Sequence, residues 1–325
     1  MSGAYPRIDP HVHCRDWEQA YKATISSVMG LAASQGVSAV FDMPNTNPSI
    51  TSLGLAKRRI ETARQEGISG GYYLYLGVTG SAAQAAEAVS AHDSLPEVIG
   101  LKMFAGKSVG NLTVEESAQR AVYRSLAEIG YRGVLAVHCE KESLSMMRLW
   151  DQTDPKSWNA ARPPVMEVEA VKEQILYAKE ERFKGILHIC HISVPEAVKA
   201  VHAARMEIRI TCGATPHHLM LSTADMDGLE GLRYKVNPPL REPLMASRLF
   251  EMLHDGMIDW IETDHAPHSP AEKAFSELGE PMSGIPSLAG YAQFISNLQK
   301  SGFGEELIRS LTYLNIKRAF AKVTE

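Results

Sequence analysis

The 325-residue sequence has no excess of basic residues and few cysteines, and both absences exclude classes of protein. Lysine and arginine total 33 against 38 acidic residues, so the formal net charge is −5. A protein of this charge lacks the basic surface that binds a nucleic acid or another polyanion. The four cysteines show no C-x-x-C spacing, so we expect reduced, mostly buried thiols at Cys14, Cys139, Cys190 and Cys212.

Long apolar runs, leader segments and repeats are also missing. No apolar stretch approaches the roughly 18 residues of a membrane span, and no charged-then-apolar segment opens the chain. These absences predict a cytoplasmic protein. No internal repeat, low-complexity tract or long linker is present, so residues 1–325 are expected to form one domain. With 45% hydrophobic residues, the chain can bury a sizeable core.

Short β-rich runs alternate with longer helical patterns along the whole chain. The predicted strands are Arg7–His11, Val37–Met43, Tyr72–Val78, Val98–Phe104, Gly133–Cys139, Gly185–Ile192, Ile208–Cys212 and Asp259–Thr263. The predicted helices are Glu18–Ser34, Leu53–Glu66, Ala82–His92, Val114–Ile129, Val165–Arg182, Pro195–Ala204, Leu244–Asp255, Ser287–Gln299 and Glu305–Ala321. This alternation implies parallel strands joined by right-handed crossovers.

Eight such strands can close into a (β/α)8 barrel, and strand counting alone leaves an open doubly wound sheet as the alternative. The positions of the unusual polar residues favour the barrel over the open sheet, because nearly all of these residues fall at the carboxyl end of a strand or just after it. That is the face on which barrels assemble their active sites. Two longer loops are candidates for lids or substrate contacts, Lys141–Pro164 and Gly213–Pro243.

The first predicted strand ends in the sequence D-P-H-V-H-C-R-D, which runs from Asp9 to Asp16. Because side chains alternate along a strand, His11 and His13 point the same way and can reach one metal ion together. Arg15 follows on the same side as a fixed positive group. Two ordinary polar residues at a strand end would give the same pattern, so this motif depends on the rest of the chain.

Two further strand ends carry polar residues that are unusual in their context. In D-M-P-N-T-N-P, two prolines stiffen a turn that directs Asn45 towards the barrel mouth, although an ordinary Asn-Pro turn would look alike. Lys102 lies inside an apolar run, where an ammonium needs a carboxylate partner, a lowered pKa or chemical modification. Carboxylation of Lys102 by CO2 would create an anionic ligand that bridges two metal ions.

The later strands end in histidines and an aspartate. His138 closes the fifth strand, and the sixth carries His188 and His191. These two are three apart and face opposite ways, so we choose His191, nearer the carboxyl end, as the one in the site. After the eighth strand, Asp264 can bind a metal through one oxygen and exchange a proton through the other. His268 follows four residues later in the loop, where it could hydrogen-bond a substrate.

Together these ligands suit a pair of borderline divalent ions, and zinc fits best. Two bridged metals lower the pKa of a shared water and polarise a carbonyl oxygen, which is machinery for hydrolysing an amide or for the reverse condensation.

With these residues in view, the chain resembles the dihydroorotases of the amidohydrolase superfamily. T-D-H-A-P-H and M-P-N-T are the most specific motifs, and the match runs in the family's order from residue 8 to about residue 320. The matching segments are Asp9–Asp16, Met43–Pro48, Gly100–Phe104, Val137–Glu140, His188–Ser193, Thr211–Leu219, Lys235–Arg241 and Thr263–His268.

The resemblance implies a role for each matched residue. His11 and His13 would bind one zinc, His138 and His191 the other, and carboxylated Lys102 would bridge the two. Asp264 would complete the first site and act as general acid/base towards a zinc-bridging hydroxide. The substrate's carboxylate and ring would be held by Arg15, Asn45, Asn237, His268 and the backbone around Ser283 and Gly284.

The implied reaction is the reversible cyclisation of N-carbamoyl-L-aspartate to L-dihydroorotate in pyrimidine synthesis. Many relatives carry a small β-sandwich, which we expect to be absent here, and Gly213 stands where some of them have an acidic residue. A hydantoinase- or allantoinase-like cyclic amide hydrolase is the nearest alternative. A non-catalytic partner of aspartate transcarbamoylase is another, and an active enzyme could also form homo-oligomers or associate with that protein.

Overall fold

A computed structural model describes residues 5–107, 112–277 and 279–323, and it contains eight parallel strands in sequential order. They are β1 (Ile8–Val12), β2 (Ala39–Asp42), β3 (Tyr72–Gly77), β4 (Val98–Phe104), β5 (Val134–His138), β6 (Ile186–Ile189), β7 (Ile210–Ala214) and β8 (Trp260–Ile261). The end of β8 returns to β1, where the His13 amide donates to the His265 carbonyl at 2.8 Å. The (β/α)8 barrel is therefore confirmed, and the open sheet is excluded.

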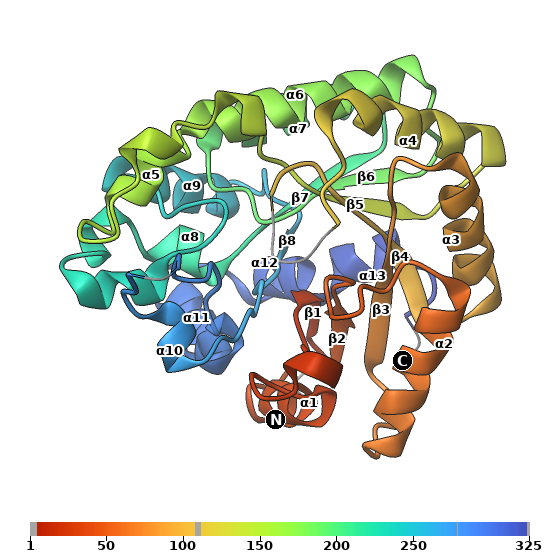
Figure 1. Cartoon of the computed structure of the whole chain (residues 1–325), viewed down its shortest axis with the longest axis horizontal. Helices are drawn as coiled ribbons and strands as arrows, with labels where there is room; N and C mark the ends of the chain where they lie inside the picture. The colour runs from red at the N-terminus through yellow and green to blue at the C-terminus, as the bar shows by residue number, and fades with distance from the viewer. Residues whose placement is uncertain (1–4, 108–111, 278, 324–325) are drawn as a thin grey trace.

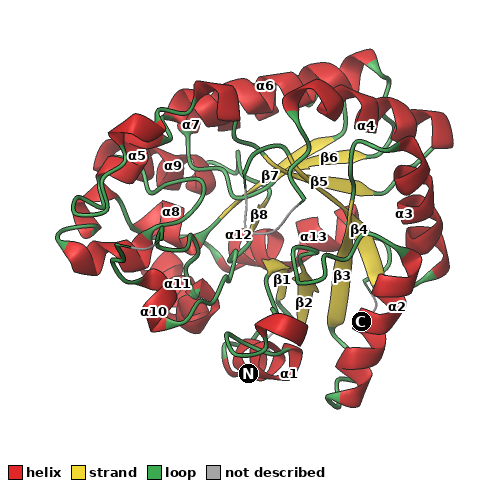
Figure 2. Ribbon diagram, viewed as in Figure 1, coloured by secondary structure: helices red, strands yellow, loops and turns green. Residues whose placement is uncertain are grey.

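Helices surround the strands, as Figures 1 and 2 show. They are α1 (Ile25–Ser34), α2 (Leu53–Gln65), α3 (Ala82–Ser94), α4 (Glu116–Ile129), α5 (Ser157–Ala161), α6 (Pro164–Glu180), α7 (Pro195–Ala204), α8 (Pro216–Met220), α9 (Pro243–His254), α10 (Pro270–Lys273), α11 (Tyr291–Lys300), α12 (Glu305–Arg309) and α13 (Asn315–Ala319). Short 3-10 helices cover Trp17–Gln19, Glu142–Leu144, Met147–Leu149, Thr223–Asp225, Leu229–Tyr234 and Ser287–Gly290. None of the helices in the described ranges is long and apolar enough to cross a membrane.

Most predicted helices differ from the structure by a few residues at their ends, and two differ by more. The helix expected from Glu18 begins only at Ile25, because Thr24 and Ser27 form a reciprocal capping box that fixes its start. The helix expected over Glu305–Ala321 is divided into α12, a π-helical turn at Ser310–Leu314, and α13. The two long loops predicted at Lys141–Pro164 and Gly213–Pro243 contain short helices in the structure.

The core has two layers that leave one end of the barrel for chemistry. One apolar layer lies between the strands and the helices, and the other fills the barrel interior. In the interior, Phe320, just after α13, packs edge-on against Phe41 with ring centroids 5.0 Å apart and lies 5.9 Å from Trp260. Ile8 at the start of β1 belongs to the same cluster. The amino-terminal end of the barrel is thus closed by apolar side chains, and polar groups are confined to the opposite end.

A buried ion pair fixes the strand that carries the H-x-H motif. Asp42, at the end of β2, accepts from Arg59 Nη2 at 2.7 Å, from the Tyr72 hydroxyl at 2.7 Å and from the Cys14 amide at 2.9 Å. The last of these bonds anchors the backbone one residue after His13. All four cysteines are buried and free, as predicted.

Candidate metal centre

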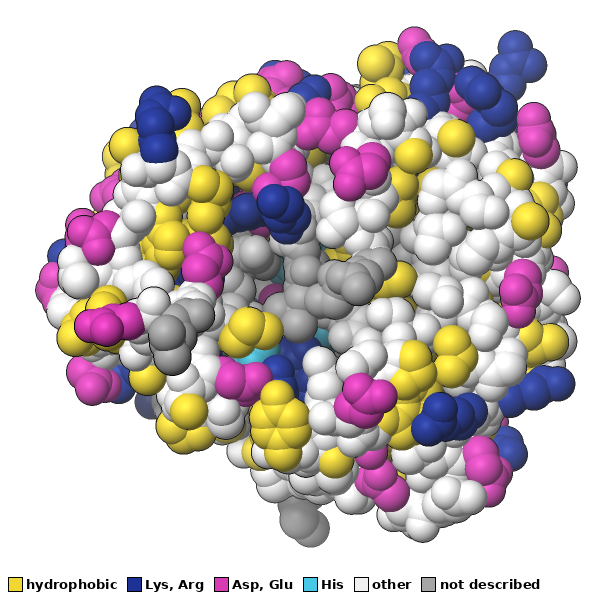
Figure 3. All heavy atoms as spheres, viewed as in Figure 1, with side chains coloured by type: hydrophobic (Ala, Val, Ile, Leu, Met, Phe, Trp, Pro, Cys, Tyr) yellow, Lys and Arg dark blue, Asp and Glu magenta, His cyan; other side chains and the backbone are white. Residues whose placement is uncertain are grey.

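The predicted site residues converge at the carboxyl ends of the strands. Ten of them line one cavity, which comprises His11, His13, Arg15, Asn45, His138, His191, Asn237, Asp264, Ser283 and Gly284 together with Phe104, Val236 and Ala266. The other two, Lys102 and His268, contact residues beside this cavity. Figure 3 shows histidine side chains together with Lys or Arg side chains in a recess near the middle of this face.

Three side chains from opposite ends of the sequence form the first half of the site. His11 Nε2 lies 3.2 Å and His13 Nε2 2.9 Å from the same Asp264 oxygen. Burial raises the pKa of Asp264, but the two histidines outweigh it and hold this pKa well below its usual range. His13 Nδ1 lies 2.7 Å from Asn45 Oδ1, an oxygen that only accepts, so Nδ1 carries the hydrogen and Nε2 is left for a cation.

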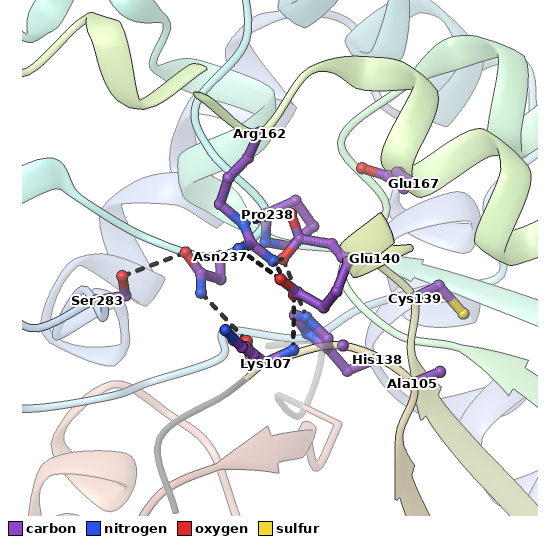
Figure 4. Close-up of polar contacts among 12 residues, drawn as sticks. Ala105, Lys107, His138, Cys139, Glu140, Arg162, Glu167, Asn237, Pro238 and Ser283 are labelled. Atoms are coloured by element: carbon purple, nitrogen blue, oxygen red, sulfur yellow. Dashed lines mark hydrogen bonds and ion pairs between the residues drawn. The ribbon is translucent and has the colours of Figure 1, made fainter. Parts of the chain in front are cut away.

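His138 and His191 form the second half of the site. His138 Nδ1 lies 3.2 Å from His191 Nε2. The other ring nitrogen of His138 contacts Glu140 at 3.1 Å, and Glu140 is held by two bonds from Arg162 at 2.9 and 2.8 Å (Figure 4). Burial, aided by His138 and His11, lowers the pKa of His191 well below its usual value. A neutral His191 is the form that binds metal.

The prediction that the two histidines of the sixth strand face opposite ways is wrong, because β6 ends before His191, and the left-handed backbone of this residue, with a φ of 37°, turns its side chain inward as well. His191 enters the cavity, whereas His188 stacks on Trp260 with ring centroids 4.3 Å apart and contacts Glu262 at 3.0 Å. Burial alone would lower the pKa of His188, but Glu262 and Cys190 raise it to about 9. His188 is therefore a buried, charged packing partner of Glu262 and lies outside the cavity.

Lys102 is fully buried on β4, and no carboxylate pairs with it within residues 5–107, 112–277 and 279–323. Its ammonium donates to the Cys190 sulfur at 3.0 Å and lies 5.0 Å from the centre of the Phe104 ring. A buried amine without a carboxylate is costly as a cation. Burial raises the pKa of the Cys190 thiol, but Lys102, with the His11 and His188 side chains nearby, outweighs it and lowers this pKa to about 5, so the group beside Lys102 is a sulfur rather than a carboxylate.

Arg15 and His268 form a polar wall beside the first half of the site. Arg15 is buried, donates to the Pro267 carbonyl at 3.1 Å and lies 3.1 Å from His268 Nε2. Lys22 donates to His268 Nδ1 at 3.3 Å, and His268 Nε2 also lies 3.1 Å from the Ser283 carbonyl oxygen. Burial, with Arg15 and Lys22 nearby, lowers the pKa of His268 to about 3.

Asn237 and the loop at Ser283 and Gly284 continue the cavity wall next to His268. Asn237 Oδ1 accepts from Trp158 Nε1 at 3.1 Å. It also accepts from the Ser283 hydroxyl at 3.2 Å (Figure 4). Gly284 has a φ of 148°, and an added Cβ would lie 2.7 Å from the Ala266 carbonyl oxygen. Only glycine allows this loop to approach the cavity so closely.

Three charged residues that contact the predicted ligands or their partners were not predicted from the sequence, namely Glu140, Arg162 and Glu262. Glu140 follows His138 at a spacing of two, and Glu262 sits in the apolar run W-I-E-T. Both were visible as carboxylates in unusual positions. Their roles depend on partners contributed by other strands and loops, which the sequence does not bring together.

The donors suit divalent metal ions. His11, His13 and Asp264 offer ligand atoms within 4.8 Å of one another, and His11, Cys190 and His191 form a second such group. The buried Nδ1 of His191 has no hydrogen-bond partner in the described part of the chain. Imidazole nitrogens that converge with a carboxylate and leave buried atoms unsatisfied are typical of a zinc site.

Comparison with known proteins gives one consistent family of sequences. The chain is 32% identical to the dihydroorotase of Halobacterium salinarum over 310 residues, which cover 95% of this chain and 69% of that protein. It is 35% identical to the dihydroorotase of Bacillus caldolyticus over 277 residues, or 82% and 61% of the two chains. The chain thus spans about two thirds or slightly less of the length of these curated relatives.

Solved structures support the fold. An L-hydantoinase (dihydropyrimidinase) from Arthrobacter aurescens superposes with a TM-score of 0.83 at 25% identity, covering 97% of this chain and 70% of that one. A D-hydantoinase from Thermus sp. gives 0.79 at 21% identity, with 97% and 70% coverage. No family model matches the sequence.

Proposed function

Because the chain belongs to the dihydroorotase family, we propose that it interconverts N-carbamoyl-L-aspartate and L-dihydroorotate, a step of pyrimidine synthesis. The observation that carries this proposal is the position of Asp264. Its carboxylate contacts His11 and His13 and lines the same cavity as Arg15, so a proton-transfer group and a fixed positive charge face one substrate.

The fit of the donors supports a metal-dependent enzyme with two zinc ions. His11, His13 and Asp264 would hold one ion, His138 and His191 the other, and Lys102, carboxylated by CO2, would lie between them. When bound, the ions would supply an activated water and polarise the amide carbonyl. The burial of Lys102 on β4, at a distance from any carboxylate among the described residues, supports its modification, because a carbamate would place an anionic ligand there.

Asp264 is the proton carrier of the proposed reaction. Its lowered pKa keeps the carboxylate ionised, which is the form that accepts the proton of the attacking water in the hydrolytic direction. It then delivers this proton to the ring nitrogen as the amide bond breaks. In the direction of ring closure the same carboxylate removes the proton from the carbamoyl nitrogen.

Arg15 supplies the charge that selects an anionic substrate. Its guanidinium is oriented by the Pro267 carbonyl and borders His268, whose neutral ring adds no competing titration near neutral pH. Asn45, Asn237 and the backbone at Ser283 and Gly284 would hold the remaining polar atoms of the ring. This arrangement favours a substrate with a carboxylate over the neutral rings of other cyclic amides. The single-domain organisation, the cytoplasmic location and any oligomer or transcarbamoylase association stay predictions.

The test is dihydroorotate hydrolysis by the purified chain, reconstituted with zinc and bicarbonate. We expect turnover that is lost in Lys102→Ala and in Asp264→Ala, with circular dichroism and thermal unfolding showing that each variant folds. General acid/base transfer alone contributes about 10²- to 10⁴-fold, so substantial activity of Asp264→Ala would refute its role.

Two negative results point elsewhere. If the chain bound two zinc ions but did not hydrolyse dihydroorotate, the metal centre would stand and the substrate would be wrong. Hydantoins and other cyclic amides would then be tested as substrates, in line with the structural neighbours. If the chain showed no turnover and bound no zinc, the result would favour a non-catalytic protein.

A further inference from the structure

A fully buried glutamate lies beneath both halves of the metal centre. Glu262 follows β8, and one of its oxygens contacts His188 Nε2 at 3.0 Å and accepts from Trp260 Nε1 at 3.1 Å. The other oxygen accepts from the backbone amide of His191 and lies 3.7 Å from His11 Nδ1. One carboxylate therefore reaches a predicted ligand of each metal ion.

These contacts constrain the ligands in two different ways. His11 directs Nε2 to Asp264, and its opposite nitrogen faces the Glu262 carboxylate at 3.7 Å, where the negative charge favours a hydrogen on Nδ1 and this ring orientation. His191 has a φ of 37°, in the left-handed region that a non-glycine residue rarely adopts. The bond from its amide to Glu262 holds the backbone in this conformation. Loss of the carboxylate would therefore loosen His11 at its ring and His191 at its backbone.

The neighbouring strand makes room for this carboxylate. Gly213 lies on β7 opposite Trp260, and a Cβ added to it would lie 2.6 Å from Glu262 Cδ and 2.7 and 2.9 Å from its oxygens. A flexible side chain could often step aside from such a methyl group. Glu262 cannot do so without breaking its contacts to the histidines and to Trp260. Gly213 and Glu262 thus form a matched pair.

We propose that Glu262 is the positioning residue that holds His11 and His191 for metal binding, and that Gly213 is required because any larger residue would displace it. This inference rests on the metal-binding part of the proposed function and is independent of the substrate. It concerns the affinity for metal and the geometry at the metal, which can be measured without turnover.

The experiment measures zinc affinity by competition with a chelating dye in the wild type, Glu262→Gln and Glu167→Gln. Glu167 is the matched control, since it is equally buried but holds Ser193, Val194 and Arg241. We expect Glu262→Gln to weaken zinc binding by about 10- to 100-fold. Glu167→Gln should leave it unchanged. Visible spectra of the cobalt-substituted proteins should change for Glu262→Gln only.

A second pair of variants tests the steric argument and remains informative if Glu262→Gln folds poorly. Gly213→Ala should weaken zinc binding in the wild-type background, but it should have no further effect when combined with Glu262→Ala, because the methyl group then has space. Wild-type affinity in Glu262→Gln, or an equal loss from Gly213→Ala in both backgrounds, would overturn the proposal.

The proposal and the proposed activity fail in distinguishable ways. A wild-type chain that binds zinc but does not hydrolyse dihydroorotate would refute the substrate, while the affinity comparison would still support or refute the role of Glu262. A wild-type chain that binds no zinc would overturn both.

Discussion

The buried pair of Arg59 and Asp42 allows a quantitative prediction about how the first ligand strand is held. Both side chains are fully buried, and Arg59 donates through Nε at 3.0 Å and Nη2 at 2.7 Å to one Asp42 oxygen. Arg59→Met would leave the carboxylate buried with only Tyr72 and the Cys14 amide as donors. Removing one partner of a buried ion pair costs about 3 to 5 kcal/mol in the free energy of unfolding.

The expected shift in melting temperature follows from the size of the chain. At about 2.1 cal/mol/K per residue, 325 residues give an unfolding entropy of about 0.7 kcal/mol/K. A loss of 3 to 5 kcal/mol then lowers the melting temperature by about 4 to 7 °C. Urea and thermal unfolding of the same samples, followed by circular dichroism, would measure both quantities.

The chain offers a matched control on the same helix. Arg64 pairs with Glu97 at 2.9 Å but has 62% of its side chain exposed, so Arg64→Met should cost at most about 1 kcal/mol. Asp42→Asn combined with Arg59→Met should be less destabilising than Arg59→Met alone, because no buried charge is left unpaired. If Arg59→Met matched the Arg64→Met control, the reasoning from burial would be refuted.

Two further predictions concern the substrate wall. Arg15→Lys keeps the charge but loses the planar fork, so kcat/KM for dihydroorotate should fall by about 10- to 150-fold, mainly through KM, whereas the exposed Arg248→Lys should be silent in the same steady-state assay. His268 has a pKa of about 3 in the folded chain against 6.5 in a model peptide, so between these pH values only the unfolded chain binds the proton. Its contribution to stability is therefore lost as pH falls through this window, by up to about 1.4 kcal/mol per pH unit, and urea unfolding at several pH values should show a flatter profile in His268→Asn. An unchanged profile would refute the assigned protonation state.

Much of the fold was predictable because periodicity reports local structure directly. All eight strands were located, since each is a short apolar run bounded by helical patterns, and the barrel followed from the polar residues at their ends. The start of α1 was wrong because the capping box at Thr24 decides it, whereas the apolar pattern extends back to Glu18. The π-helical turn within Ser310–Leu314 has no comparable sequence signal that we can identify.

The site was predictable where a residue's own position on a strand determines its direction. His11 and His13 were placed by the alternation of side chains, and His191 by its position nearer the carboxyl end of its strand; the structure brings all three to one cavity. The supporting charges were not predictable in this way. Arg162 reaches Glu140 only because the path of the loop after β5 returns to the cavity, and Glu262 acts through space left by a glycine on another strand.

The supporting contacts explain how the ligands are ordered by the fold itself. The ring nitrogens that face away from the candidate metal positions contact Asn45 at His13, Glu140 at His138 and Glu262 at His11. Each of these partners is buried, and the two glutamates are neutralised by Arg162 and His188. The apolar amino-terminal half of the barrel excludes water from beneath them, so these charges interact strongly. The conformational entropy of the ligands is therefore lost on folding, and a metal ion that binds later meets donors that are already oriented.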